Sequence, residues 1–267
     1  MNRLERRLSN LAEKNRKAVV SYIVAGDPNL DESLSAMHAL VSSGVDILEL
    51  GVPFSDPSAE GPIIQLGHER ALANQTNMRD VLCLVKQFRE KDAETPVVLM
   101  GYANPIEWIG HQNFAANAAE AGVDGVLTVD IPPEEAGDLN KALIDHGLVN
   151  IFLLAPTTSE SRIKEIVELA SGFLYYVSLK GTTGSAKLDV KDVEAKLAEI
   201  RKFTKLPICV GFGIKTAETA AQVARIADGV VIGSALVEII SQPVHAAQRI
   251  AAISDYCSLI REALDQH

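Results

Sequence analysis

The chain has 267 residues, 47% of them hydrophobic, which is enough to bury a large core as one α/β barrel or as two smaller domains. Its formal net charge is −10 and it has no long basic cluster, which argues against binding to nucleic acid or anionic lipid. No apolar run approaches the roughly 18 residues that a membrane span needs.

The first element expected along the chain is an amphipathic helix. Its acids are mixed with bases, unlike a signal peptide, and three leucines recur at helical spacing: Leu4, Leu8 and Leu11. Short β-branched runs then alternate with segments of helical period. The runs predicted as strands are residues 17–25, 46–52, 96–102, 125–130, 150–156, 173–178, 207–213 and 228–233.

Eight strand–helix pairs in about 250 residues predict a (β/α)8 TIM barrel, an α/β fold with parallel strands, with the additional N-terminal helix before it. A doubly wound sheet is the competing architecture. Its fingerprint is missing, since the nearest match, GFGIKT from Gly211, lacks the third glycine and follows the seventh strand. Because the chain has no low-complexity linker, residues 1–267 are predicted to form a single domain.

Cysteine and histidine usage gives no sign of a metal site. Cys83, Cys209 and Cys257 are far apart and odd in number, which predicts buried free thiols in a reducing compartment. The six histidines form no H-x-x-x-H pattern and are interpreted as core or surface residues. Together these features predict a cytoplasmic protein.

Glu49 is an acid inside an otherwise apolar predicted strand. Strand period places it opposite Leu48 and Leu50, so it points into the barrel mouth if the leucines pack against helices. No Lys or Arg lies between residues 18 and 69 to pair with it locally. Burial raises the pKa of such a carboxyl group, as proton transfer near neutral pH requires. We interpret Glu49 as a catalytic candidate; the alternative is a structural acid paired through the fold.

Glu60 follows eleven residues later, beside a Gly-Pro turn. An acid at such a turn is ordinary turn chemistry, which leaves a purely structural role open. Prolines stiffen the surrounding loop, however, and would fix a second carboxyl group near the first: Pro53, Pro57 and Pro62.

Two stretches with glycine, GFGI at 211–214 and IGSA at 232–235, follow the seventh and eighth strands, where many barrels bind phosphate. Glycine lets backbone amides approach the oxygens, and free N–H groups near Ser234 would face the anion. SLKGTTGSAKL at 178–188 is either a flexible crossover or a lid that closes over substrate.

Motifs spread along nearly the whole chain point to one protein family. The most specific is LELGVPFSDPSAEGP at 48–62. The others are YIVAGDP at 22–28, MGYANP at 100–105, VDIPPEE at 129–135, YYVSLKGTTG at 175–184, VGFGI at 210–214 and VIGSA at 231–235. In this order the motifs resemble those of the tryptophan synthase alpha chain family.

The resemblance implies a carbon–carbon lyase of tryptophan biosynthesis that cleaves indole-3-glycerol phosphate to indole and glyceraldehyde 3-phosphate. By its match, Glu49 would protonate the indole C3 and deprotonate the glycerol hydroxyl. Glu60 would accept a hydrogen bond from the ring N–H and stabilise the developing positive charge. Tyr175 and Thr183 match strand and lid positions, and Thr183 is expected to close onto Glu60.

The resemblance also implies the substrate-binding positions. Those matching the phosphate loops are Gly184, Phe212, Gly213, Gly233 and Ser234. Those matching the wall of the indole pocket are Tyr22, Ile64, Met100, Tyr102, Leu127, Val129 and Leu153.

A partner is implied as well. Chains of this family need no metal or organic cofactor and dock on a pyridoxal-phosphate beta chain as an α2β2 assembly, to which indole passes through a tunnel. The residues that match positions at or beside that interface are Pro53, Asp56, Asn104 and Pro132.

Two positions on one loop depart from the family pattern. The second acid is most often Asp, whereas Glu60 is longer by one methylene, and the usually aliphatic position 58 is Ser58. We expect a compensating shift of the loop backbone, because a misplacement of about 1 Å can cost roughly a hundredfold in rate.

Two alternative functions remain. One is an isomerase of a phosphorylated substrate, disfavoured by the apolar wall, and the other is a barrel that mainly activates its beta partner.

Overall fold

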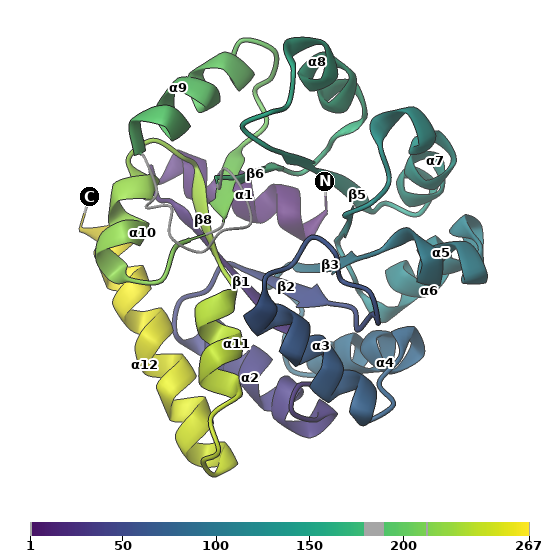
Figure 1. Cartoon of the computed structure of the whole chain (residues 1–267), viewed down its shortest axis with the longest axis vertical. Coiled ribbons are helices and arrows are strands. Elements are labelled where there is room, and N and C mark those ends of the chain that lie inside the picture. Colours follow the sequence, from purple (N-terminus) through teal and green to yellow (C-terminus); the bar gives the residue numbers. More distant parts are fainter. Residues whose placement is uncertain (1, 179–189, 212, 267) are drawn as a thin grey trace.

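The computed structural model describes residues 2–178, 190–211 and 213–266, and its centre is a closed barrel of parallel strands (Figure 1). Each strand pairs with the next along the chain, and β8 closes the ring on β1. The strands are β1 (Ala18–Val24), β2 (Ile47–Gly51), β3 (Val97–Gly101), β4 (Gly125–Thr128), β5 (Val149–Leu154), β6 (Leu174–Val177), β7 (Ile208–Gly211) and β8 (Gly229–Ile232). The predicted fold is confirmed, and only β5 begins earlier than expected, by one residue.

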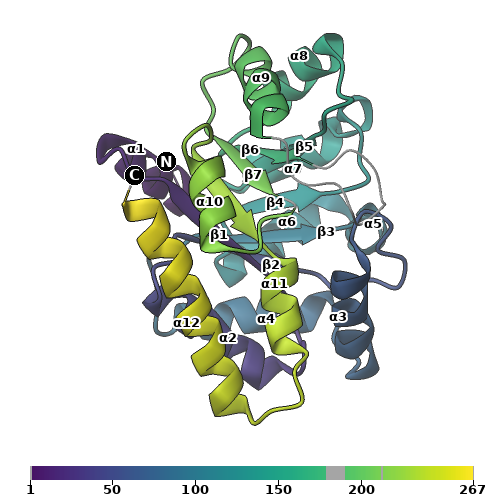
Figure 2. The same ribbon diagram turned by 60° about the vertical axis from the view of Figure 1, so that its left-hand side comes forward.

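Helices surround the barrel and fill the connections between strands (Figure 1). In chain order they are α1 (Arg3–Glu13), α2 (Leu30–Ser42), α3 (Pro62–Ala73), α4 (Met78–Arg89), α5 (Ala103–Ile109), α6 (His111–Ala121), the 3-10 turn η1 (Pro133–Glu135), α7 (Gly137–Asp145), α8 (Glu160–Leu169), α9 (Val190–Ile200), α10 (Ala217–Ala224), α11 (Ser234–Ile240) and α12 (Ala246–Asp265). The long C-terminal helix α12 packs on α2 and α10 (Figure 2). In the described part of the chain, no helix is both long and apolar enough to cross a membrane.

Strand alternation separates two apolar layers, because successive side chains point to opposite faces. In β2, Leu48 and Leu50 belong to the layer between sheet and helices, whereas Ile47 belongs to the cluster inside the barrel. Glu49 therefore shares the inward face with Ile47, as its spacing predicts. Because Glu49 lies near the carboxyl end of β2, its side chain is directed into the barrel mouth.

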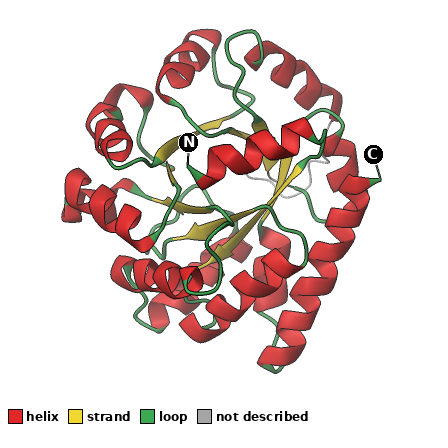
Figure 3. Cartoon of the chain, turned by 180° about the vertical axis from the view of Figure 1, so that it is seen from behind, coloured by secondary structure: helices red, strands yellow, loops and turns green. Residues whose placement is uncertain are grey.

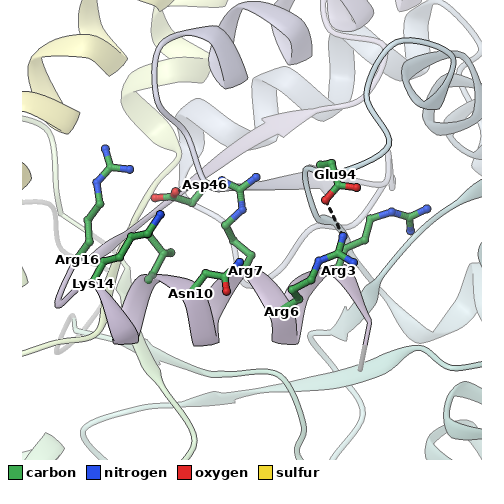
Figure 4. Close-up of a pocket in the computed structure, with 9 residues that line it drawn as sticks. Arg3, Arg6, Arg7, Asn10, Lys14, Arg16, Asp46 and Glu94 are labelled. Atoms are coloured by element: carbon green, nitrogen blue, oxygen red, sulfur yellow. Dashed lines mark hydrogen bonds and ion pairs between the residues drawn. The ribbon is translucent and has the colours of Figure 1, made fainter.

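Helix α1 covers the opposite end of the barrel (Figure 3). Its three predicted leucines are buried and join the interior cluster: Leu4, Leu8 and Leu11. Basic side chains on another side of the helix extend toward Asp46 and Glu94 around a cavity of about 160 Å³ (Figure 4). Arg3 pairs with Asp124 at 3.0 Å and Arg7 with Asp46 at 3.6 Å. The cavity thus lies among the ion pairs that attach α1 to the starts of the strands.

The cysteines are free thiols, as expected. Cys209 and Cys257 are buried, but Cys83 is exposed on α4. The prediction that all three are buried is therefore wrong for Cys83, because it lies on the solvent face of an amphipathic helix whose core face carries Val81, Leu84 and Val85.

Candidate active site

Glu49 is completely buried, with 0% of its surface exposed. Among the residues that the structure describes, neither of its carboxylate oxygens has a hydrogen-bond partner. Burial raises the pKa of Glu49 to about 8, and the nearby negative charge of Glu60 contributes in the same direction. A carboxyl group in this state is largely protonated at neutral pH and can both donate and accept a proton near pH 8.

Glu60 is the second acid, on the loop between β2 and α3, and it too is buried. The Tyr102 hydroxyl donates a hydrogen bond to its Oε2, and the backbone N–H of Ala59 donates to the Tyr102 oxygen at 3.1 Å. The Tyr102 ring stacks on Phe54 with centroids 4.9 Å apart. Burial raises the pKa of Glu60 despite the opposing effect of the Tyr102 hydrogen bond. The longer side chain is thus turned inward, while the expected shift of its loop backbone stays a prediction.

His68 on α3 is not among the site residues that the sequence predicts, yet it lies beside both Tyr22 and Glu60. Its Nδ1 accepts a hydrogen bond from the Phe54 N–H at 3.1 Å, and its Nε2 lies 3.2 Å from the Tyr22 hydroxyl. The same Nε2 is 4.0 Å from Oε1 of Glu60. Burial lowers the pKa of His68 to about 4. The sequence signal that could have found it is a histidine on the buried face of the helix directly after Glu60.

The predicted wall of the indole pocket comes together from several strands. Met100 packs against both the barrel-interior cluster and a smaller cluster that contains Tyr22 and Ile64. Three further wall residues belong to the interior cluster or pack against it, together with Tyr175: Leu127, Val129 and Leu153. Met100 thus links the two clusters to which these predicted wall residues belong.

Two strand-end glycines leave room for the tyrosines of this wall. A Cβ at Gly51 would overlap the Tyr22 hydroxyl, and a Cβ at Gly211 would overlap the ring and hydroxyl of Tyr175. Each tyrosine therefore reaches across the neighbouring strand only because that strand ends in glycine.

The described residues of the predicted phosphate loops follow β7 and β8. Gly213 follows β7 with a φ of +79°, and Gly233 directly precedes α11, which begins at Ser234. Thr183, Gly184 and Phe212, and the predicted lid beyond Ser178, lie outside the described residues. Within the described ranges, no group of three or more His, Cys, Asp or Glu residues is arranged to hold a metal ion.

The predicted interface residues follow neighbouring strands at the same end of the barrel. Pro53 and Asp56 come after β2, Asn104 lies in α5 after β3, and Pro132 follows β4. Asp56 and Asn104 are exposed, whereas Pro53 is buried. Trp108, also on α5, is 88% exposed and is not among the residues that the sequence motifs single out.

Comparison with known proteins decides the family. The family model described as "Tryptophan synthase alpha chain" matches residues 8–264. The tryptophan synthase alpha chain of Thioalkalivibrio sulfidiphilus is 56% identical, covering 99% of this chain and 100% of the relative, and that of Marinobacter nauticus is 54% identical, covering 99% and 98%. The chain belongs to the tryptophan synthase alpha chain family.

Solved structures of tryptophan synthase agree with this assignment. The alpha subunit from Legionella pneumophila str. Paris is 46% identical, covers 100% of both chains and superposes with a TM-score of 0.92. A chain of the aminoacrylate-bound tryptophan synthase from M. tuberculosis is 32% identical, covers 99% of this chain and 100% of its own length, and has a TM-score of 0.88.

Membership of the tryptophan synthase alpha chain family confirms the resemblance seen in the motifs. The chain is a lyase subunit that cleaves indole-3-glycerol phosphate. In this family the alpha chain carries no cofactor, and pyridoxal phosphate belongs to the beta chain.

Proposed function

We propose that this chain cleaves indole-3-glycerol phosphate with Glu49 as the proton-transferring group and Glu60 as the group that holds the ring nitrogen. The observation that carries the proposal is the complete burial of Glu49 with both oxygens unpartnered among the described residues, which raises its pKa to about 8. A structural glutamate would have its oxygens satisfied by neighbouring donors. Glu49 is instead held beside an apolar wall.

In the first step, protonated Glu49 donates its proton to C3 of the indole ring. The ring gains positive charge, shared with its nitrogen, and the carboxylate of Glu60 accepts the ring N–H. Because the site is buried, this interaction is stronger than it would be in water. Tyr102 holds the Glu60 carboxylate by its second oxygen and so leaves the first for the ring.

In the second step, the Glu49 carboxylate removes the proton of the glycerol hydroxyl next to C3. The oxygen forms a carbonyl as the carbon–carbon bond breaks, and the electron pair of that bond returns to the ring. The products are indole and glyceraldehyde 3-phosphate, and Glu49 is protonated again. One group thus serves as acid and then as base.

Substrate binding is divided between the wall and the glycine loops. The apolar wall around Met100 takes the indole ring, and Tyr175 lies near Glu49, since burial and then the charge of Glu49 raise the pKa of Tyr175. Backbone amides at Gly213, Gly233 and Ser234 bind the phosphate, with Gly184 and Phe212 completing the loops. Thr183 of the lid closes onto Glu60 once substrate is bound.

The chain works as a single domain in the cytoplasm and docks on a tryptophan synthase beta chain in an α2β2 assembly. One similar solved structure, from Pyrococcus furiosus, is that of a tryptophan synthase complex; its matching chain is 34% identical, with a TM-score of 0.83 and 92% of this chain covered. The docking face includes Asp56, Asn104 and Pro132 at the mouth. This placement allows indole to pass directly from the pocket to the partner.

The test is indole release from indole-3-glycerol phosphate by the purified chain, with and without a beta chain. Glu49→Gln keeps the shape of the side chain but cannot exchange protons, and Glu69→Gln on the exposed face of α3 is the matched control. Cleavage that rises with the partner and is lost only in Glu49→Gln supports the proposal. Absence of cleavage with the partner bound refutes it and leaves a barrel that only activates its partner.

A further inference from the structure

We propose that His68 is a positioning residue of this site, whose neutral imidazole orients the Tyr22 hydroxyl and restrains the longer side chain of Glu60. The inference rests on the proposed function, because it assigns roles to His68 and Tyr22, which lie around the same two acids. The two side chains are part of a series of hydrogen bonds that runs from the Phe54 backbone through His68 to Tyr22.

The imidazole has a fixed place. His68 is 1% exposed and lies on the buried face of α3 together with Gly67 and Ala71. A Cβ at Gly67 would come within 3.0 Å of Val237 and 3.1 Å of both Val24 and the Asp27 carboxylate, so α3 lies close against β1 and α11. The ring therefore cannot turn out to solvent without moving the helix.

The tautomer of His68 follows from its partners. The Phe54 N–H can only donate, so Nδ1 must accept and carries no proton. In the neutral ring the proton is then on Nε2, which lies 3.2 Å from the Tyr22 oxygen and donates to it. Burial, which lowers the pKa of His68 to about 4, keeps this neutral form through the physiological range.

Tyr22 is thereby turned into a donor toward the site. Its oxygen accepts from His68, so its own proton points elsewhere, and the described residues include no acceptor for it. Tyr22 is paired with Glu49 in the register of β1 and β2. Burial and the charges of Glu60 and Glu49 all raise the pKa of Tyr22, so the hydroxyl keeps its proton beside the two acids.

Glu60 is hydrogen-bonded at one oxygen and lies near His68 with the other. The Tyr102 hydroxyl donates to Oε2, while Oε1 lies 4.0 Å from Nε2 of His68. Glutamate has one more rotatable bond than the aspartate usual at this position, so it needs a second restraint to keep one geometry. A distance of 4.0 Å is too long for a hydrogen bond, and the Nε2–H is donated to Tyr22, so the restraint on Glu60 is the nearness of the polar edge of the imidazole.

The experiment combines His68→Asn and Tyr22→Phe with Glu60→Asp in a double-mutant cycle, measured as kcat and KM for cleavage with the beta chain present. In the natural background we expect His68→Asn to lower kcat by about tenfold, with KM changed by less than about twofold. With Glu60→Asp the same substitution should cost less than about threefold, since the shorter carboxyl group no longer faces the imidazole. Tyr22→Phe should lower kcat by a smaller factor while leaving His68 in place.

The matched control is His38→Asn. His38 lies on α2 and packs on Phe88, with ring centroids 4.9 Å apart, outside the barrel. We expect it to leave kcat unchanged whatever its effect on melting temperature. Equal losses from His68→Asn in both Glu60 backgrounds, or a loss confined to KM, would overturn the proposal.

A spectroscopic measurement decides the point even if His68→Asn does not fold. Nitrogen-15 chemical shifts of the histidine rings in the full chain should identify one neutral ring, protonated on Nε2 from about pH 5 to 8, in contact with the Phe54 amide. A proton on Nδ1, or a charged ring at about pH 6, would refute the proposal. Absence of cleavage by the unaltered chain would instead refute the proposed function. Failure of the His68 proposal and failure of the proposed function can therefore be told apart.

Discussion

Glu49→Gln should make the protein more stable while it removes catalysis. The carboxyl group has a pKa of about 8 when folded, against 4.5 for the unperturbed group. Between these values the unfolded chain loses a proton that the native chain retains, so stability falls as pH rises from about 4.5 to about 8. Below that window both states are protonated and the penalty vanishes. Glutamine has nearly the same shape and does not titrate.

The size of the effect follows from the same two values. At pH 7 the retained proton costs roughly 3 kcal/mol of unfolding free energy, rising to roughly 5 kcal/mol above pH 8. For a chain of this size each kcal/mol corresponds to about 2–4 °C in melting temperature. Glu49→Gln should therefore melt about 6–12 °C higher than the unaltered chain at pH 7, with a much smaller difference at pH 4.5.

The assay is thermal unfolding followed by circular dichroism at about pH 4.5, 6, 7 and 8.5 in one ionic strength. Glu69→Gln on α3 is the control, because it makes the same substitution at an exposed carboxylate and should leave the melting temperature nearly unchanged. The reasoning is refuted if the advantage of Glu49→Gln does not grow between about pH 5 and 8, or if the unaltered chain is the more stable one at about pH 8.5.

Three further outcomes are expected. Cleavage by the chain with its partner should decline above about pH 8, as Glu49 loses the proton that it must donate; a rate that keeps rising to about pH 10 would contradict the assignment. Tyr102→Phe removes the donor to Glu60 and, since a hydrogen bond to a charged group contributes roughly 1.5–3 kcal/mol, should lower kcat by about ten- to a hundredfold in steady-state assays run well below the melting temperature of the variant. Trp108 is the single tryptophan and is 88% exposed, so binding of the beta chain should shift its fluorescence emission to shorter wavelength, and an unshifted spectrum at saturation would place α5 outside the interface.

The sequence predicts what depends on regular spacing. The period of two in β2 places Glu49 inside the barrel, and the alternation of strands and helices brings the ends of β7 and β8 beside each other. Both results follow from local pattern plus the parallel topology. The placement of Tyr175 also follows, because its strand has the same alternation.

Contacts between elements that are not adjacent in the chain could not be predicted from the sequence. His68 meets Tyr22 only because Gly67 lets α3 approach β1, a distance that no periodicity encodes. The hydrogen bond from Tyr102 to Glu60 likewise depends on how the loop after β2 folds over the end of β3. A general interpretation of histidines as core or surface residues cannot separate such cases.

Helix α1 closes the base of the barrel, and the two ends of the barrel differ in how their acidic side chains are paired. At the base, Asp46 and Asp124 are each shared by two arginines, Arg7 with Arg261 and Arg3 with Arg89. At the mouth, the acids are held with few partners and weaken the fold. Rigidity is thus concentrated where no chemistry occurs, and it offsets the instability of the reactive end. Substitutions that change substrate preference can accumulate around the mouth for as long as the base remains intact.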